Sequence, residues 1–135
     1  MPPLTASFNL EPSSPFRIDL TVWTLRRRPD NLFDRWDGKT YRRVLIVDDK
    51  PFEIAVTQCE ESENLRVVVT GIKLTLSLKN YVTVALERLL GIKIDLQKFY
   101  RLSKKDQWLR PLVNQFKGMK PPRMLTPFEA LINAI

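Results

Sequence analysis

Few side chains in this sequence have a type that suits catalysis or metal binding. It contains no His and a single Cys, Cys59. Zinc sites built from Cys and His, Ser-His-Asp triads and Cys-His pairs therefore cannot form within this chain. The four glycines stand apart from one another, so neither a phosphate-binding loop nor a dinucleotide fingerprint can be built. We expect no metal and no cofactor, and any chemistry would have to use carboxylates, lysines or hydroxyls.

The carboxylates and lysines show no pattern that suits catalysis either. Asp48 and Asp49 are neighbours, and neighbouring side chains on a strand or turn point in different directions, so a hairpin turn explains them better than acid/base work. The acidic residues at 60–63 have the composition of a solvated loop. Lys104 and Lys105 follow a helix end, and nothing marks either as the desolvated amine that Schiff-base chemistry needs. We expect no catalytic residue in this chain.

Positive charge is concentrated in one segment. The chain carries +7 overall, and residues 93–123 hold nine Lys or Arg against Asp95 and Asp106 alone. Aromatic residues interleave with these cations, a combination that attracts polyanions and nucleic acid first among them. A solvated face on ordinary helices is the alternative. The candidates for DNA contact are Lys98, Arg101, Lys104, Lys105, Lys117, Lys120 and Arg123, and for Arg123 an ion pair with Glu129 is the alternative. Three further arginines, at 26–28, are interpreted as a strand end that reaches water.

Alternating side chains predict an antiparallel sheet in the first half of the chain. Residues 16–22 alternate between apolar and polar, the pattern of a half-buried strand. Asp37-Gly38 is a turn signal, and residues 41–47 and 52–57 flank a second turn as a hairpin. Residues 65–72 predict a further strand. Links this short join antiparallel strands, so we expect a sheet with one wet face.

The hydrophobic period changes after residue 72. Leucines at 74–78 still alternate, so the strand is expected to resume there. Residues 82–90 then follow a 3.6-residue period, with Ser77 or Asn80 as the helix cap and Gly91 as its stop. Strands first and helices afterwards is the order of an α+β fold.

Two shorter helices and a connector are predicted next. Residues 95–102 form the first, with Asp95 as its cap, and Ser103 with Asp106 resembles the capping box of the second. The second helix has its apolar face along residues 108–116, Trp108 included. Two prolines within residues 119–125 exclude helix and impose an extended connector.

The segment 126–135 has the signals of a final amphipathic helix. Thr126 can cap it, Glu129 lies three residues after the cap, and Leu131, Ile132 and Ile135 follow at helical spacing. Burial of each of these three side chains would stabilise the fold by roughly 1.5–3 kcal/mol. They either fold back onto the sheet or belong to a second domain, and we favour the second reading because the connector directs the helix away.

These pieces together resemble a known family. The segment 90–135 is similar to the stretch preceding the catalytic domain in helix-hairpin-helix superfamily DNA glycosylases, the DNA-3-methyladenine glycosylase II type being the nearest branch and 8-oxoguanine glycosylases its relatives. The resemblance is carried by the following motifs: Asp95-Leu96 with Phe99-Tyr100, Asp106 to Leu109, Gly118 with Pro121-Pro122-Arg123, and Phe128-Glu129-Ala130-Leu131 with Ala134-Ile135. The run at 37–58 also resembles that family's N-terminal sheet.

The resemblance implies a fold and a division into domains. The fold is an antiparallel sheet backed by helices, like one repeat of the TATA-box-binding-protein fold. The expected division is an N-terminal extension at 1–14, a sheet-and-helix domain at 15–118, the Pro-rich connector at 119–125, and at 126–135 the first helix of a missing catalytic domain. In the family, the helix-hairpin-helix and the catalytic Asp beside the flipped base lie downstream of that helix, so neither is expected here.

The first hypothesis for function is therefore the non-catalytic N-terminal domain of a DNA glycosylase that excises damaged purines in base-excision repair. The parent protein would bind DNA, and Trp23 and Trp36 are candidates for lining its base pocket, with packing as the alternative for both. A stand-alone nucleic-acid-binding or protein-interaction module is the second hypothesis. Self-association through the terminal helix is the third. No run of apolar residues is long enough to span a membrane.

Localisation is expected to be cytoplasmic and nucleoid-associated. A lone Cys59 cannot form an internal disulfide, which favours a reducing compartment. We expect Cys59 to be a half-buried structural thiol.

Overall fold

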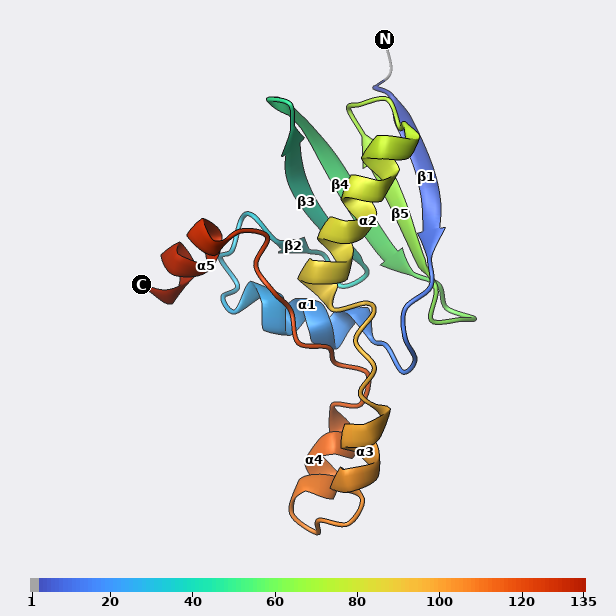
Figure 1. Cartoon of the computed structure of the whole chain (residues 1–135), viewed down its shortest axis with the longest axis vertical. Helices are drawn as coiled ribbons and strands as arrows, with labels where there is room; N and C mark the ends of the chain where they lie inside the picture. The colour runs from blue at the N-terminus through green and yellow to red at the C-terminus, as the bar shows by residue number, and fades with distance from the viewer. Residues whose placement is uncertain (1–2) are drawn as a thin grey trace.

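The computed structural model describes residues 3–135, and its fold is α+β (Figure 1). The elements in chain order are β1 (Thr5–Leu10), α1 (Ile18–Arg26), β2 (Arg35–Trp36), β3 (Thr40–Val47), β4 (Lys50–Gln58), β5 (Leu65–Thr70), α2 (Leu76–Leu90), α3 (Gln97–Ser103), α4 (Leu109–Gln115) and α5 (Pro127–Ala134). The five strands form one antiparallel sheet in the order β1-β5-β4-β3-β2. The predicted fold class is confirmed.

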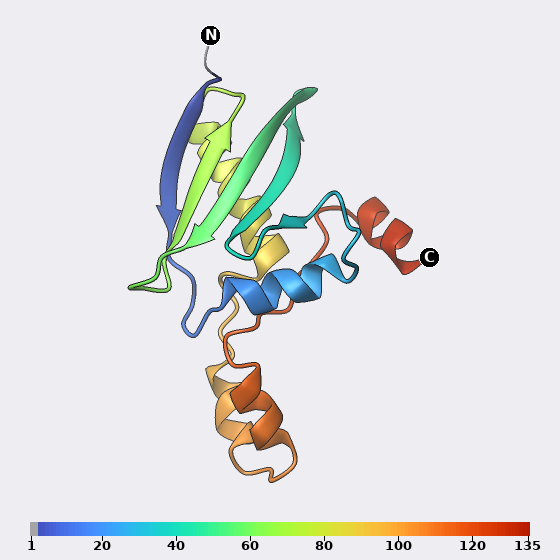
Figure 2. The same ribbon diagram turned by 180° about the vertical axis from the view of Figure 1, so that it is seen from behind.

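Helices cover one face of this sheet and leave the other open. Helix α2 lies across the face turned to the viewer in Figure 1, with α1 below it, and Figure 2 shows the opposite face uncovered. The core lies between α1, α2 and the inner face of the sheet. Its buried members include Val22, Leu86, Ile54, Val56 and Val67.

The sheet confirms the predicted central hairpin. Strands β3 and β4 pair from Val47↔Lys50 to Thr40↔Thr57. Asp48 and Asp49 both have positive φ, 50° and 61°, as a two-residue turn of matching twist requires. The adjacent carboxylates are therefore explained by the turn, as the sequence predicted.

Residues 16–22 were expected to form a strand, and this prediction is wrong. They contribute to α1, because Ile18, Val22 and Leu25 recur at helical spacing and are all buried. The start of α1 has no local cap. Instead, Gln58 at the end of β4 accepts a hydrogen bond from the Ile18 amide (3.0 Å) and donates to the Phe16 carbonyl (2.8 Å). A cap supplied from 40 residues away leaves no signal in the local sequence.

The residues at 1–14, expected as an extension, supply an edge strand. Residues 5–10 pair along their whole length with β5, from Thr5↔Thr70 to Leu10↔Leu65. Thr5, Ser7 and Asn9 are exposed, while Ala6, Phe8 and Leu10 are half-buried, so the run TASFNL carries the polar and apolar alternation of a half-buried strand.

The strand expected to resume at 74–78 is also absent, because α2 begins there. Thr75 is its cap and accepts a hydrogen bond from the Leu78 amide (3.1 Å), so neither Ser77 nor Asn80 caps the helix. Gly91 ends α2 in the left-handed conformation, with φ of 59°, as predicted.

Helices α3 and α4 form a helical hairpin, residues 97–118, that extends away from the sheet (Figures 1 and 2). The proposed capping box is wrong, because Ser103 is the last residue of α3 and its hydroxyl donates to the Tyr100 carbonyl. Asp106 alone caps α4 and accepts from the amides of Trp108 (2.8 Å) and Leu109 (3.0 Å). The connector after the hairpin contains neither helix nor strand, as predicted.

Candidate nucleic-acid interface and docking groove

The helical hairpin gathers most of the predicted DNA-contacting cations. Residues 97–118 contain six Lys or Arg and one acidic residue, Asp106. The exposed candidates on the hairpin are Lys98, Arg101, Lys104, Lys105 and Lys117. Lys117 lies over the ring of Tyr100, with 5.6 Å between its Nζ and the ring centroid. The hairpin thus presents a dense cationic surface that stands clear of the sheet.

Lys120, also a candidate, is not available to DNA. Its side chain is fully buried where the connector passes α2, and its Nζ donates to the Ile94 carbonyl. Burial lowers the pKa of Lys120, although the charges of Asp95 and Glu63 partly oppose this effect. Its role is to hold the connector, so its assignment as a DNA-binding residue is corrected here.

Arg123 remains exposed on the connector, but the pairing proposed for it is absent. The sequence suggested Glu129 as the partner of Arg123, in place of a DNA phosphate. Glu129 pairs instead with Arg43 of β3, while the Arg123 amide donates to the Arg88 carbonyl at the end of α2.

The two tryptophans proposed for a base pocket lie apart. Trp36 packs half-buried against the core, which agrees with the packing alternative. Trp23 of α1 is 66% exposed, and its ring stacks on Phe116, with centroids 6.4 Å apart and planes 6° from parallel. This stack joins α1 to the base of the helical hairpin. Neither tryptophan lines the groove described next.

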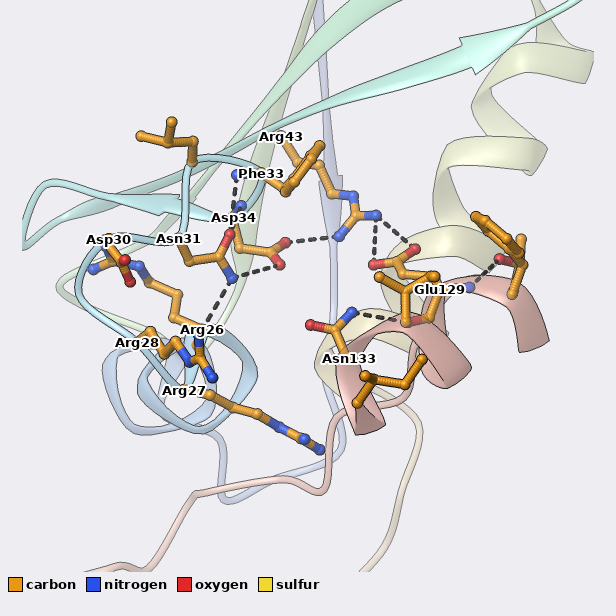
Figure 3. A pocket seen from close by; sticks show the side chains of 15 residues that line it. Arg26, Arg27, Arg28, Asp30, Asn31, Phe33, Asp34, Arg43, Glu129 and Asn133 are labelled. Atoms are coloured by element: carbon orange, nitrogen blue, oxygen red, sulfur yellow. Dashed lines mark hydrogen bonds and ion pairs between the residues drawn. The ribbon is translucent and has the colours of Figure 1, made fainter.

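A groove of about 690 Å³ lies between α5 and the loop that follows α1 (Figure 3). One wall is the segment 26–34, with exposed Leu32 and Phe33, and the other is α5, with exposed Phe128 and Ile132. The arginines at 26–28 stand on the first wall at the end of α1, so they are not the strand end that the sequence suggested. The groove combines apolar walls with a basic rim.

A buried ionic network closes the floor of this groove. Arg43 reaches between the two walls, with Nη1 2.8 Å from Asp34 Oδ1 and Nη2 2.8 Å from both carboxylate oxygens of Glu129 (Figure 3). The Tyr41 hydroxyl donates to the same Asp34 oxygen at 2.6 Å. The side chains of Arg43 and Asp34 are only 9% and 5% exposed. The network therefore joins the sheet, the loop and α5.

Electrostatics keep this network charged. Burial acts to lower the pKa of Arg43, but its hydrogen bond with Glu129 and the charge of Asp34 outweigh that effect and raise it. Burial, followed by the charge of Asp34, raises the pKa of Tyr41 well above its ordinary value. Arg43 is therefore cationic and Tyr41 is a neutral donor at neutral pH.

The final helix forms where the sequence predicted it. Thr126 caps α5 by accepting from the Glu129 amide (3.1 Å). The alternative in which its apolar residues fold back onto the sheet is wrong, because Leu131 is 61%, Ile132 54% and Ile135 96% exposed. Helix α5 is fixed to the sheet by the Arg43–Glu129 ion pair, while its apolar residues face the groove and solvent.

The sequence did not reveal the Arg43–Glu129 ion pair, and it placed Trp108 and Cys59 wrongly. Arg43 and Glu129 are 86 residues apart in the chain, so no local pattern connects them. Trp108 was expected on the buried face of a helix, yet it is 81% exposed because it precedes α4. Its position two residues after an aspartate that can cap a helix was the available signal. Cys59, expected to be half-buried, is exposed.

Within residues 3–135, no three His, Cys, Asp or Glu side chains come together as a metal site would require. None of the helices in this part of the chain has the length and apolar character needed to cross a membrane.

Comparisons with known proteins give a similarity to a solved structure. No protein-family model matches the sequence, and no curated protein matches it either. Among solved structures, the chain is similar to a 3-methyladenine DNA-glycosylase from Archaeoglobus fulgidus, with a TM-score of 0.66 and 21% identity. The match covers 88% of this chain and 39% of the glycosylase chain. The protein therefore has a DNA-glycosylase-like fold, and it spans about two fifths of the length of that enzyme.

Proposed function

We propose that these 135 residues are the non-catalytic, DNA-contacting domain of a DNA glycosylase that removes damaged purine bases. The observation that carries the proposal is the structural similarity to a 3-methyladenine DNA-glycosylase over 88% of the chain. The helix-hairpin-helix and catalytic Asp of such an enzyme would belong to the part of the glycosylase that the match leaves uncovered.

The surface of α5 supports a docking role in this arrangement. Phe128 and Ile132 face an open groove together with Leu32 and Phe33 of the opposite wall. Apolar side chains gathered at one place on a surface mark sites of interaction. We propose that a helical catalytic part packs here, with the Arg43–Glu129 ion pair holding α5 at the correct angle.

The helical hairpin supports the DNA contact. Its cations would neutralise phosphates and release counterions, so each contact contributes about 0.9 to the slope of log K against log salt concentration. A tenfold change in salt concentration therefore changes the affinity roughly eightfold for each contact. The domain alone is expected to bind duplex DNA weakly and without sequence preference.

Fluorescence anisotropy of a labelled duplex, measured from 50 to 200 mM salt, tests the DNA contact. Lys104→Ala/Lys105→Ala is expected to reduce the salt slope by about 1.8 if both lysines contact phosphate. Lys50→Ala/Lys73→Ala removes the same charge from exposed positions at the far end of the sheet and is the matched control. Equal effects of the two double variants would contradict a specific role for the hairpin.

A glycosylase assay tests the non-catalytic assignment. The chain is incubated with duplex DNA that carries an alkylated purine, or 8-oxoguanine, at one position. We expect no release of the base. Excision by the chain alone would show that it holds its own catalytic residues and would overturn this part of the proposal.

A stand-alone nucleic-acid-binding module is the second candidate, and the charge of the hairpin favours it, because six cations against one acid need no second domain to attract DNA. Affinity separates the two: a module that acts alone should bind DNA tightly at physiological salt. Sedimentation velocity tests self-association through α5. A dimer that Ile132→Asp converts to a monomer would identify α5 as a contact between copies of this chain.

A further inference from the structure

We propose that the tip of the helical hairpin reads distorted DNA by stacking Trp108 on an unpaired or unstacked base. The hairpin tip is defined here as residues 104–108. This inference rests on the proposed DNA contact and adds the feature of DNA that the surface recognises.

Trp108 is presented to solvent in an unusual way for a tryptophan. Its side chain is 81% exposed. Trp23 is the next most exposed tryptophan, and its ring stacks on Phe116. No aromatic ring within residues 3–135 stacks on Trp108. Its indole is thus a large, mostly exposed flat surface without an aromatic stacking partner in the described residues, and tryptophan is on average a highly buried residue.

The backbone beneath Trp108 is held by a set of hydrogen bonds. Asp106 accepts from the amides of Trp108 and Leu109 through one carboxylate oxygen. The amides of Lys105 and Asp106 donate to the carbonyls of Leu102 and Ser103, each at 3.2 Å. A side chain that projects from an ordered turn loses less entropy on binding than one on a mobile loop. The tip therefore holds the backbone of Trp108 in a defined position.

The charges around Trp108 favour a nucleic acid as its partner. Lys104 and Lys105 belong to the same turn, and Arg101 and Arg110 lie in the flanking helices. The single nearby carboxylate, that of Asp106, is occupied by two backbone amides, which lower its pKa. Phosphates flanking a base would meet the cations while the base meets the indole, the pairing of contacts used by proteins that bind single-stranded or opened nucleic acid.

A membrane surface also attracts exposed tryptophan together with lysine. Binding there uses a helix with a continuous apolar face. Helices α3 and α4 have seven residues each, and Trp108 lies in the turn between them rather than on such a face. The geometry therefore suits a stacked base better than a bilayer.

An intact duplex offers Trp108 no free base, because every base is already stacked on its neighbours. Insertion becomes favourable where the stack is open, as at an abasic site, a mismatch or a single-stranded segment, because the cost of unstacking has already been met there. The hairpin tip is therefore expected to prefer DNA opened in this way, by about tenfold for one stacked base.

The test uses the chain 1–135 and three fluorescein-labelled oligonucleotides, namely a fully paired duplex, the same duplex with one tetrahydrofuran abasic analogue, and the single strand. Anisotropy titrations compare the parent chain with Trp108→Ala. Phe33→Ala removes a similarly exposed aromatic (79%) from the groove wall and is the matched control. Circular dichroism spectra confirm that each variant is folded.

The expected result is a preference of about tenfold for the abasic duplex and the single strand, which Trp108→Ala abolishes without changing affinity for the paired duplex. Phe33→Ala should keep the preference. If Trp108→Ala keeps it too, the stacking inference fails while DNA binding stands. If none of the three DNAs binds, the proposed function fails as well. Trp108-dependent binding to phosphatidylserine vesicles, without a preference among the three DNAs, would contradict the inference and identify a membrane as the partner of Trp108.

Discussion

Removal of the Asp34 carboxylate tests how strongly the buried network holds the fold. Asp34 accepts hydrogen bonds from Tyr41 and Arg43, and its side chain is 5% exposed. In Asp34→Ala the Tyr41 hydroxyl loses its partner, and Arg43 keeps only Glu129. Loss of one partner from a buried ion pair costs about 3–5 kcal/mol.

This cost converts to a large change in melting temperature. The entropy of unfolding is about 2.1 cal/mol/K per residue, which for 135 residues is about 0.28 kcal/mol/K. The expected decrease in Tm is therefore about 10–18 °C. Thermal melts followed by circular dichroism measure this decrease, and urea titrations measure the free energy of unfolding. At 10 °C the variant should keep the circular dichroism spectrum of the folded parent, because its buried core is unchanged.

Glu53 provides a control with the same local chemistry on the open face of the sheet. Whereas Asp34 pairs with one arginine, Glu53 pairs with two, Arg35 (2.8 Å) and Arg42 (3.3 Å), and its side chain is 34% exposed. Each exposed ion pair contributes about 0–1 kcal/mol, so the loss of both pairs in Glu53→Ala should lower Tm by at most about 7 °C. Comparable losses for the two variants would refute the argument that burial, rather than the number of ion pairs, sets the cost.

Other predictions concern the connector, the hairpin and the glycines. Gly118→Ala should destabilise the fold by about 2–4 kcal/mol in urea titrations, because its added Cβ would lie 3.0 Å or less from backbone and side-chain atoms of Arg17. Gly38 has a similar φ but open space around it, so Gly38→Ala should cost only about 1 kcal/mol. Lys120→Met should leave DNA affinity unchanged in anisotropy titrations. A lysine whose pKa is lowered in the folded state binds fewer protons there than in the unfolded state, so it makes the free energy of unfolding rise with pH up to the unfolded pKa of 10.5. Lys120→Met should remove this rise. Asp106 has a lowered pKa, so its capping contribution is present above its unfolded pKa and is lost as pH falls through the lower folded value. NMR titration of the Trp108 amide should follow that loss, and Asp106→Asn should remove the titration.

Sequence patterns were sufficient where the contacts are local. The β3–β4 hairpin was predicted because its turn and both strands lie within 20 residues, and α5 because Thr126 and Glu129 supply its start. Residues 16–22 were wrongly predicted as a strand because Ile18 and Val22 fit both a two-residue alternation and a helical spacing of four. The deciding contact, from Gln58, comes from a distant strand.

The candidate site was harder to predict than the fold. Exposed cations on the hairpin could be recognised from charge alone, but charge could not distinguish Lys104 from the buried Lys120. The groove depends on the approach of α5 to the loop after α1, which is fixed by Arg43 and Glu129. A pairing across 86 residues becomes visible only in three dimensions.

Strand β1 has a consequence for how this protein behaves in a crowded solution. It covers β5, whose run Leu65–Thr70 is rich in valine and has the composition of segments that stack into fibrils. The outermost edge is then offered by β1, a short strand with Thr5, Ser7 and Asn9 at its exposed positions. Proteolytic trimming or a deletion before residue 11 would uncover β5 and turn the flank of the sheet into a template that recruits other chains.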